Sequence, residues 1–267
     1  MRTLELWAVI LVAAALLSGC QGAISPEGRR LLATADAAYR RGDDAAAIQA
    51  SSRFLQVHPR LEEAGEAHYL RGVSRLRSKD AVGGKADLLA AVKLAKRQDL
   101  LALAHVKLGE LAYGADDMPQ AESHYRWALE QARPGAPPAD EAMYRLGCVL
   151  QRLGRWGEAD QHFDRLIYLF EGTEAAKRAQ GRVRAVRWSV QAGAFEKGST
   201  AAAERLSADL NRTGLFGKTR VDVELRQGRL MRLVRVGSYQ TYDAARADPL
   251  FEKVRAIRPD AFITAAR

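Results

Sequence analysis

The sequence predicts a multidomain α+β protein, in which an all-α array of paired helices is followed by a small βαββαβ domain. Alanine is abundant and aromatic residues make up only 7% of the chain, which favours helix. Small residues recur at a fixed spacing through the first two thirds of the sequence. From about Trp188 the apolar residues alternate with a period of two and β-branched residues appear, which indicates strands.

Length and composition allow about two folded domains in a chain of 267 residues. Hydrophobic residues make up 48% of the sequence, enough for packed cores. The formal net charge is +9, and a basic surface favours acidic partners such as nucleic acid, anionic lipid or an acidic polymer. The alternative is that the arginines only keep an alanine-rich protein soluble.

The first twenty residues are a candidate export signal. Arg2 precedes the apolar run LWAVILVAAALL at residues 6–17, which is too short to span a bilayer and is typical of a signal peptide. The following Leu17-Ser18-Gly19-Cys20 resembles a bacterial lipobox. This resemblance implies removal of residues 1–19 and a lipid anchor on Cys20. Gln21 stands where an Asp would imply retention at the inner membrane, so the expected location is the outer membrane, facing the periplasm.

The expected location restricts the possible partners. No later apolar stretch reaches the length of a membrane span. A periplasmic protein does not meet cytosolic nucleic acid, so no nucleic acid is expected among the partners. Residues 20–30 are interpreted as a linker between the anchor and the first helix.

Residues 31–170 are predicted to form an array of helical repeats. Small residues recur every 37 or 38 positions: Ala47, Gly84, Ala121 and Ala159. Each repeat would be a helix–turn–helix that buries its apolar face only against its neighbours. The third repeat contains Leu108-Gly109 and, further along, Tyr125. The fourth contains Leu146-Gly147 and, at the same spacing, Phe163. These residues make the two repeats resemble tetratricopeptide repeats. The first two repeats depart from that family at Asp36 and Arg75, near positions that are usually apolar or small.

The tetratricopeptide resemblance implies a groove that binds a peptide or a partner protein. Residues 171–187 follow the array as a basic linker with a short helix over 172–179. Two interpretations stay open for this helix: it covers the last apolar face of the array, or it is a solvated helix.

Residues 188–267 are predicted to fold in the order βαββαβ, with two helices on one face of a sheet. The expected strands cover 189–195, 220–225, 230–237 and 261–264, and a helix covers 200–211. A turn at Gln227-Gly228 joins the middle strands. Pro249 interrupts the second helix, which leaves 244–248 as a single turn.

Two segments of this domain share the pattern V-x-x-G-x-aromatic, namely VQAGAF at 190–195 and VRVGSY at 234–239. Strict alternation would turn the valines toward the helices. The residues expected on the opposite face are Gln191, Phe195, Arg235 and Tyr239. Ala194 is expected to point toward the helices.

These two segments resemble the SPOR domain of bacterial cell-envelope proteins, and the resemblance covers 188–267. It implies binding to peptidoglycan, with a preference for glycan strands that lack stem peptides, as occur at division septa. The implied binding residues are Gln191, Phe195, Arg235 and Tyr239. An amide can bind sugar hydroxyl and N-acetyl groups, and a guanidinium can bind the lactyl carboxylate of muramic acid.

Each implied binding residue has a structural alternative. Phe195 and Tyr239 would otherwise be core residues that close the sheet edge, and Arg235 a solvated strand residue. The family often has a polar residue at the position of Ala194, so this chain lacks one expected hydrogen bond.

No catalytic site, cofactor or metal site is predicted. The five histidines lie in the helical array without metal-ligand spacing, and Cys148 is expected in its core. Paired carboxylates of a glycosidase and a G-x-S-x-G motif are both missing. The same topology serves in RNA-binding modules, whose basic-Gly-aromatic signature is also missing.

We therefore expect a non-catalytic cell-envelope lipoprotein that acts in cell division or cell-wall remodelling. It would bind glycan strands through 188–267 and envelope or division proteins through the helical array. The alternative function is a scaffold lipoprotein for outer-membrane protein assembly or envelope organisation, in which the array is the essential part.

Overall fold

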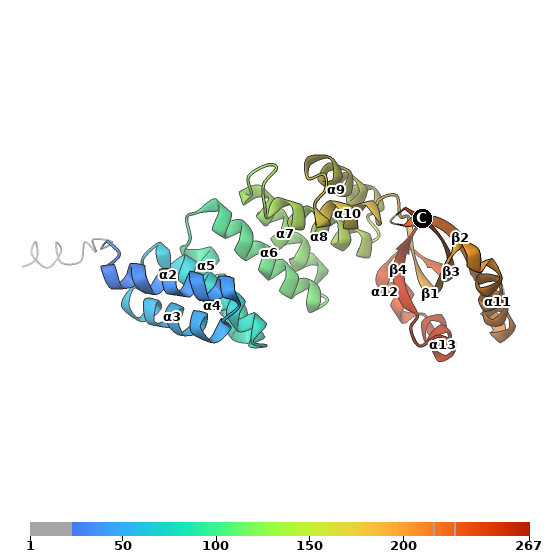
Figure 1. Cartoon of the computed structure of the whole chain (residues 1–267), viewed down its shortest axis with the longest axis horizontal. Helices are drawn as coiled ribbons and strands as arrows, with labels where there is room; N and C mark the ends of the chain where they lie inside the picture. The colour runs from blue at the N-terminus through green and yellow to red at the C-terminus, as the bar shows by residue number, and fades with distance from the viewer. Residues whose placement is uncertain (1–22, 216, 227) are drawn as a thin grey trace, which may run out of the picture. The chain divides into compact units, whose positions relative to one another are not determined.

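The computed structural model describes residues 23–215, 217–226 and 228–267 (Figure 1). The expected signal peptide and Cys20 lie outside these residues. The chain divides into two compact units, Met1–Leu108 and Gly109–Arg267, and the boundary falls within α6 (Gln98–Gly114). Within the described residues, no helix is both long enough and apolar enough to cross a membrane.

The first unit consists of helical hairpins. Its helices are α2 (Pro26–Arg41), α3 (Asp44–Val57), α4 (Glu63–Arg77) and α5 (Ala81–Leu94). Consecutive helices pack against one another. Asp43 and Asp80 begin α3 and α5 by accepting a hydrogen bond from a backbone N–H three residues further on, the usual role of an N-cap carboxylate.

The second unit continues the helical repeats and then changes to a sheet. Its complete helices before the sheet are α7 (Met118–Gln131), α8 (Ala139–Arg152), α9 (Trp156–Leu169) and α10 (Glu174–Gln180). Asp117 caps α7 as Asp43 and Asp80 cap α3 and α5. Ala175 and Ala179 of α10 are buried in the same core as α8 and α9. The short helix after the repeats therefore covers an apolar face, which was one of the two open interpretations.

The predicted repeat spacing marks the close contacts between helices. Its small residues are the fourth residues of α3, α5, α7 and α9, and all four are buried: Ala47, Gly84, Ala121 and Ala159. In the third repeat, a Cβ on Gly109 would lie 2.7 Å from the ring of Tyr125. Gly147 contacts the ring of Phe163 in the same way. In each of these repeats the glycine of the Leu-Gly pair therefore contacts the aromatic ring that lies sixteen residues further on.

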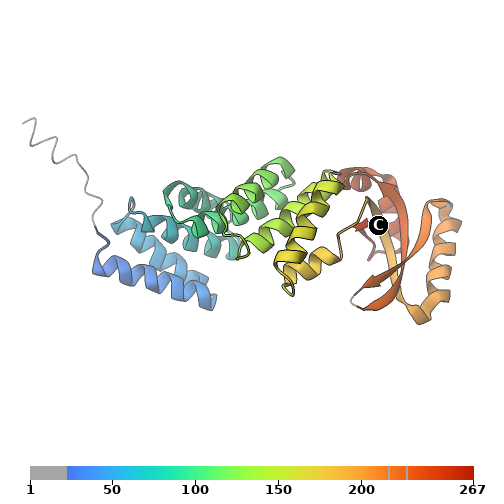
Figure 2. The ribbon, with the colours of Figure 1, turned by 90° about the horizontal axis from the view of Figure 1, so that it is seen from above.

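The C-terminal part of the second unit has the predicted βαββαβ order. Its elements are β1 (Arg187–Glu196), α11 (Thr200–Leu210), β2 (Thr219–Arg226), β3 (Arg229–Tyr239), α12 (Tyr242–Ala247), α13 (Pro249–Ile257) and β4 (Phe262–Ala266), with short helical turns at Lys197–Ser199 and Asn211–Leu215. The strands form an antiparallel sheet in the order β2-β3-β1-β4. Figure 2 shows α11 in orange alongside this sheet.

Pro249 interrupts the second helical stretch as predicted, and a new helix begins there. Proline is tolerated in the first turn because its missing N–H has no partner at that place in any helix. Asp248 caps α13 by accepting a hydrogen bond from Leu250 N at 2.8 Å. The second helix of the domain is therefore α12 followed directly by α13.

One face of the sheet packs on the helices. Its core contains Val190, Val234 and Val236 of the sheet together with Leu206 of α11 and Val254 of α13. We call the opposite face of the sheet the open face. It carries the residues of β1 that alternate with Val190, including Ser189 and Gln191.

The sheet domain packs directly on the last repeat. Trp188 of β1 donates a hydrogen bond to Gln151 O of α8 at 2.9 Å, and Trp156 of α9 donates one to Gln240 O at 3.2 Å. The two indole rings lie 5.8 Å apart between centroids. Within the second unit, the sheet is thus joined to α8 and α9 by buried aromatic contacts as well as by the covalent chain.

Candidate functional site

A β-bulge in β1 reverses the predicted alternation after Gln191. Gln191 pairs with Arg235, but Gly193 pairs with the next residue of β3, Val234, so β1 contains one extra residue. An extra residue turns the following side chains to the other face. Phe195 therefore packs against the helix-side core. The prediction that Phe195 lies on the open face is wrong, and its core alternative is correct.

A second bulge lies in β3 and moves Tyr239 in the same way. Val190 pairs with Val236, whereas Trp188 pairs with Tyr239, so the extra residue is at Gly237–Ser238. Tyr239 packs against the helix-side core, and its hydroxyl donates to Asp248 Oδ2 at 3.0 Å. The prediction of Tyr239 on the open face is also wrong.

The repeated G-x-aromatic pattern is a packing motif. A Cβ on Gly193 would lie 2.8 Å from the ring of Phe195, and a Cβ on Gly237 would lie 2.6 Å from the ring of Tyr239. Gly237 also has a φ of +74°, which side chains other than glycine rarely adopt. In both segments the bulge and the missing Cβ let an aromatic ring lie over the glycine two residues before it.

The first bulge also brings Ala194 to the open face. Ala194 pairs with Leu233 and is exposed, contrary to its predicted place toward the helices. The position at which the family often has a polar residue is therefore on the same face as Gln191.

The open face carries a row of paired residues that crosses all four strands. Arg220 of β2 pairs with Arg235 of β3, which pairs with Gln191 of β1, which in turn pairs with Phe262 of β4. We call these four residues the cross-strand row. Phe262 is 50% exposed, so the row offers an accessible aromatic ring beside an amide and two guanidinium groups.

Gln191 and Arg235 lie on the open face as predicted, whereas Arg220 and Phe262 were missed. Phe262 stands in the predicted last strand, so its aromatic character was visible. Its place beside Gln191 depends on the pairing of strands that are about seventy residues apart, which local alternation does not determine.

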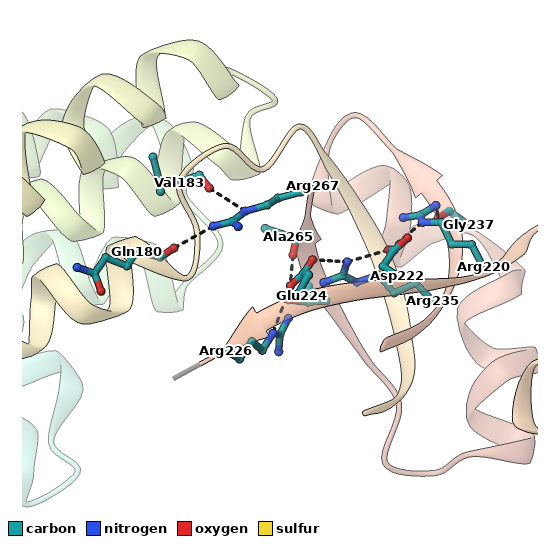
Figure 3. A network of polar contacts seen from close by, with 11 residues as sticks. Gln180, Val183, Arg220, Asp222, Glu224, Arg226, Arg235, Gly237, Ala265 and Arg267 are labelled. Atoms are coloured by element: carbon teal, nitrogen blue, oxygen red, sulfur yellow. Dashed lines mark hydrogen bonds and ion pairs between the residues drawn. The ribbon is translucent and has the colours of Figure 1, made fainter. Parts of the chain in front are cut away.

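Arg235 is fully buried and forms ion pairs with two carboxylates of β2. Its Nη1 lies 2.8 Å from Asp222 Oδ2 and 2.6 Å from Glu224 Oε1 (Figure 3). Burial alone would raise the pKa of both carboxyl groups, but the hydrogen bonds and positive charges of Arg235, together with those of Arg220 for Asp222 and Arg226 for Glu224, outweigh it and lower both pKa values. Arg235 is therefore neither a solvated strand residue nor an exposed ligand contact.

Several buried polar atoms of the open face make no hydrogen bond to any described residue. They are Arg187 Nε, Ser189 Oγ, Gln191 Oε1, Arg220 Nη2, and Arg235 Nε and Nη2. Most buried polar groups in proteins are paired, and leaving one unpaired costs about 1–3 kcal/mol. A concentration of such atoms on one face fits a surface that binds a polar ligand.

The charges of this face favour an anionic ligand. Arg220 and Arg235 form ion pairs with Asp222 and Glu224. Arg187 lies near enough to interact with Asp222 through its charge, so three guanidinium groups face two carboxylates and positive charge is in excess. Burial and the positive charges of Arg220 and Arg235 lower the pKa of Arg187. A carboxylate on the ligand would relieve this repulsion and accept hydrogen bonds from the unpaired guanidinium N–H groups.

The described residues contain no group of three or more His, Cys, Asp and Glu side chains that could hold a metal ion. Cys148 is buried in the core of the last repeats, as predicted.

Comparison with known proteins identifies two domain types. The family model described as "SPOR domain" matches residues 184–264, and the one described as "Tetratricopeptide repeat" matches residues 141–173. No curated protein sequence matches the chain. The matched SPOR segment begins just before β1 and contains the whole cross-strand row.

Several solved structures resemble a part of the chain. A tetratricopeptide repeat protein from Parabacteroides merdae is 15% identical, with a TM-score of 0.49 and coverage of 58% of both chains. MamA from Desulfovibrio magneticus is 13% identical, with a TM-score of 0.47, covering 60% of this chain and 86% of that one. RapI is 13% identical, with a TM-score of 0.50, covering 76% and 78%. At these identities the likeness concerns the fold alone.

SPOR domains bind peptidoglycan and tetratricopeptide repeats bind proteins, so both domain types are binding modules. The row, the unpaired polar atoms and the excess of positive charge all lie within the segment that the first family model matches. The chain therefore carries a tetratricopeptide repeat at 141–173 and a SPOR domain at 184–264.

Proposed function

We propose that this protein is a non-catalytic cell-envelope protein that binds glycan strands without stem peptides through the open face of its SPOR domain. One observation carries the proposal: unpaired buried polar atoms gather on the open face beside the exposed ring of Phe262. The ring can stack on a sugar, and Gln191 Oε1 can accept a hydrogen bond from a sugar hydroxyl or N-acetyl group.

The excess of positive charge gives a chemical reason for the preference. In intact peptidoglycan the lactyl group of muramic acid is joined to the stem peptide as a neutral amide. Removal of the peptide leaves a carboxylate. Arg187 and Arg220 are the partly exposed members of the arginine group, so they are the residues that we assign to this carboxylate, with Arg235 behind them.

We further propose that the helical array binds envelope or division proteins and that Cys20 anchors the protein in the outer membrane. The protein would then connect a membrane, a partner protein and stripped glycan at sites of cell-wall remodelling or division. The support for the anchor is the sequence Leu17-Ser18-Gly19-Cys20.

The test is a pulldown of the whole protein with sacculi, either intact or stripped of stem peptides by an amidase. We expect binding to rise on stripping. Gln191→Ala should lower binding about tenfold, because one hydrogen bond to a charged or well-ordered group contributes roughly 1–1.5 kcal/mol. Phe262→Ala should lower it about fivefold, since covering half of an aromatic ring contributes about 1 kcal/mol.

Matched controls are available in the helical array. Gln49 and Tyr168 are exposed, so Gln49→Ala and Tyr168→Ala change the same residue types away from the open face. Equal binding to both kinds of sacculi would contradict the preference for stripped glycan. Unchanged binding of both open-face variants would contradict the assignment of the site.

A further inference from the structure

A groove of about 980 Å³ lies between α10 and the sheet. One wall comes from α10 and the residues after it, including Lys177 and Arg182. The other comes from the hairpin of β2 and β3, including Arg226 and Arg229. Thr264 of β4 also lines the groove, and it lies on the open face because it pairs with Ser189 of β1.

The groove continues the open face of the sheet. One of its lining residues is Glu224, which forms an ion pair with Arg235 of the open face. A ligand lying on the cross-strand row and extending along β2 toward the hairpin would therefore enter the groove. Its volume is at the upper end of the roughly 300–1,000 Å³ that small-ligand sites usually have, which gives room for more than one sugar ring.

Bonds from the last residues of the chain join α10 and the sheet at one place. Arg267 donates to Gln180 O at 3.1 Å and to Val183 O at 3.2 Å (Figure 3). Val186 N donates to Ala266 O at 2.9 Å. These contacts attach the end of α10 and the residues after it to the end of β4. The wall that carries α10 is thus joined to the sheet by hydrogen bonds within the second unit.

The groove has more cationic than anionic side chains. The cations are Lys177, Arg178, Arg182, Arg226, Arg229 and Arg267, and the carboxylates are Glu174, Glu196 and Glu224. The pair of Lys177 with Glu174 is exposed on both sides, and so is the pair of Arg229 with Glu196. Exposed pairs are weak and exchange readily, so Lys177 and Arg229 are able to bind an incoming carboxylate.

We propose that α10 forms a second wall of the glycan site, so that the helix covering the end of the helical array also contributes to binding. The occupant is the same stripped glycan strand, whose carboxylates recur along the polymer. One carboxylate lies at the arginines of the open face, and the next lies between Lys177 and Arg229. This inference rests on the proposed function of the open face.

The test uses the whole protein and two soluble probes. One is a stripped glycan oligosaccharide with its lactyl carboxylates, and the other is the same oligosaccharide with those carboxylates converted to methyl amides. Lys177→Glu is the wall variant, and Lys93→Glu on α5 is its control, because Lys93 is exposed and far along the chain from the groove. Gln191→Ala is the open-face variant, and thermal unfolding checks that each variant is folded.

We expect Lys177→Glu to weaken binding of the carboxylate probe about five- to tenfold and binding of the amide probe less than twofold. Lys93→Glu should match the unchanged protein with both probes.

Wild-type affinity of Lys177→Glu for the carboxylate probe, together with a loss of affinity in Gln191→Ala, would overturn the second wall and leave the open-face site in place. A loss with both probes would overturn the assignment of a carboxylate to the groove. Unchanged binding of Gln191→Ala together with Phe262→Ala would instead overturn the open-face site itself.

Discussion

Two buried ionic clusters of this protein differ in how completely their polar atoms are paired. In the first unit, Asp87 accepts hydrogen bonds from Arg71 at 2.6 and 2.9 Å and from Arg75 at 2.7 Å, and lies 2.8 Å from His68 Nδ1. None of these four side chains has a buried atom left unpaired among the described residues. In the SPOR domain, Arg235 holds two carboxylates but keeps Nε and Nη2 unpaired.

This difference separates a cluster that stabilises the fold from one that is arranged for a ligand. The Asp87 cluster also explains why Arg75 stands where tetratricopeptide repeats usually have a small residue, since its guanidinium is needed by Asp87. Complete pairing makes the Asp87 cluster a structural element. Incomplete pairing on the open face leaves hydrogen-bonding capacity for the glycan ligand that we propose.

The largest effect is expected from Asp87→Ala. Removing the carboxylate leaves two arginines and a histidine without their partner, which should lower the free energy of unfolding of the first unit by about 3–5 kcal/mol. Chemical denaturation followed by circular dichroism measures it. Asp36→Ala is the control, because Asp36 forms a surface pair with Arg40 and should cost less than about 1 kcal/mol. Similar losses in the two variants would mean that the Asp87 cluster contributes little.

Arg235→Met should destabilise the SPOR domain less, by about 2–3 kcal/mol. Asp222 and Glu224 lose one partner but keep Arg220 and Arg226, at 3.1 and 3.3 Å. The same variant should also lose most glycan binding, whereas Asp87→Ala should not change it. Pulldown with stripped sacculi measures the binding, and denaturation measures the stability. Unchanged binding by Arg235→Met would contradict the conclusion that the Arg235 cluster is arranged for a ligand.

The Asp87 cluster also predicts a pH dependence. Burial opposes the charge of Asp87, but the hydrogen bonds from His68 and Arg71 prevail and lower its pKa from 3.8 to about 2. A lowered pKa stabilises the fold above the unfolded value and loses this contribution as pH falls through the folded value. The stability difference between the unchanged protein and Asp87→Asn should therefore shrink by about 2 kcal/mol between about pH 5 and pH 2. A stability difference that stays constant over this pH range would contradict a lowered pKa of Asp87 in the cluster.

The smallest effect is expected from Ala194→Ser. Ala194 is exposed on the open face, and a hydroxyl there supplies the polar group that the family often has. We expect glycan to bind two- to tenfold more tightly, in line with roughly 0.5–1.5 kcal/mol for one hydrogen bond. Ala208→Ser on α11 is the control, since Ala208 is exposed outside the open face. Equal affinities of the two variants would show that glycan does not reach position 194.

The helical repeats and the element order of the SPOR domain were predictable because they follow local periodicity. Ala47, Gly84, Ala121 and Ala159 have the same place in their helices, so one spacing shows all four contacts. Secondary structure of this kind depends on residues close in the sequence, and period and spacing report it directly.

The faces of the strands were only half predictable, because both bulges change the alternation. Gln191 precedes the bulge in β1 and is placed correctly, whereas Phe195 follows it and is not. The visible signal was glycine within a strand, at Gly193 and Gly237, which often marks a bulge. The cross-strand row depends on pairing between distant segments, so Arg220 and Phe262 could not be found from alternation alone.

The contact of Trp156 with Trp188 has a mechanical consequence. A flexible linker would let a bound glycan strand move without loading the helices. Here a pull on the sheet acts at once on α8 and α9 through the hydrogen bonds of both indoles. With glycan bound as proposed, this joint would transmit tension in the cell wall to the repeats whose core contains Tyr125 and Phe163.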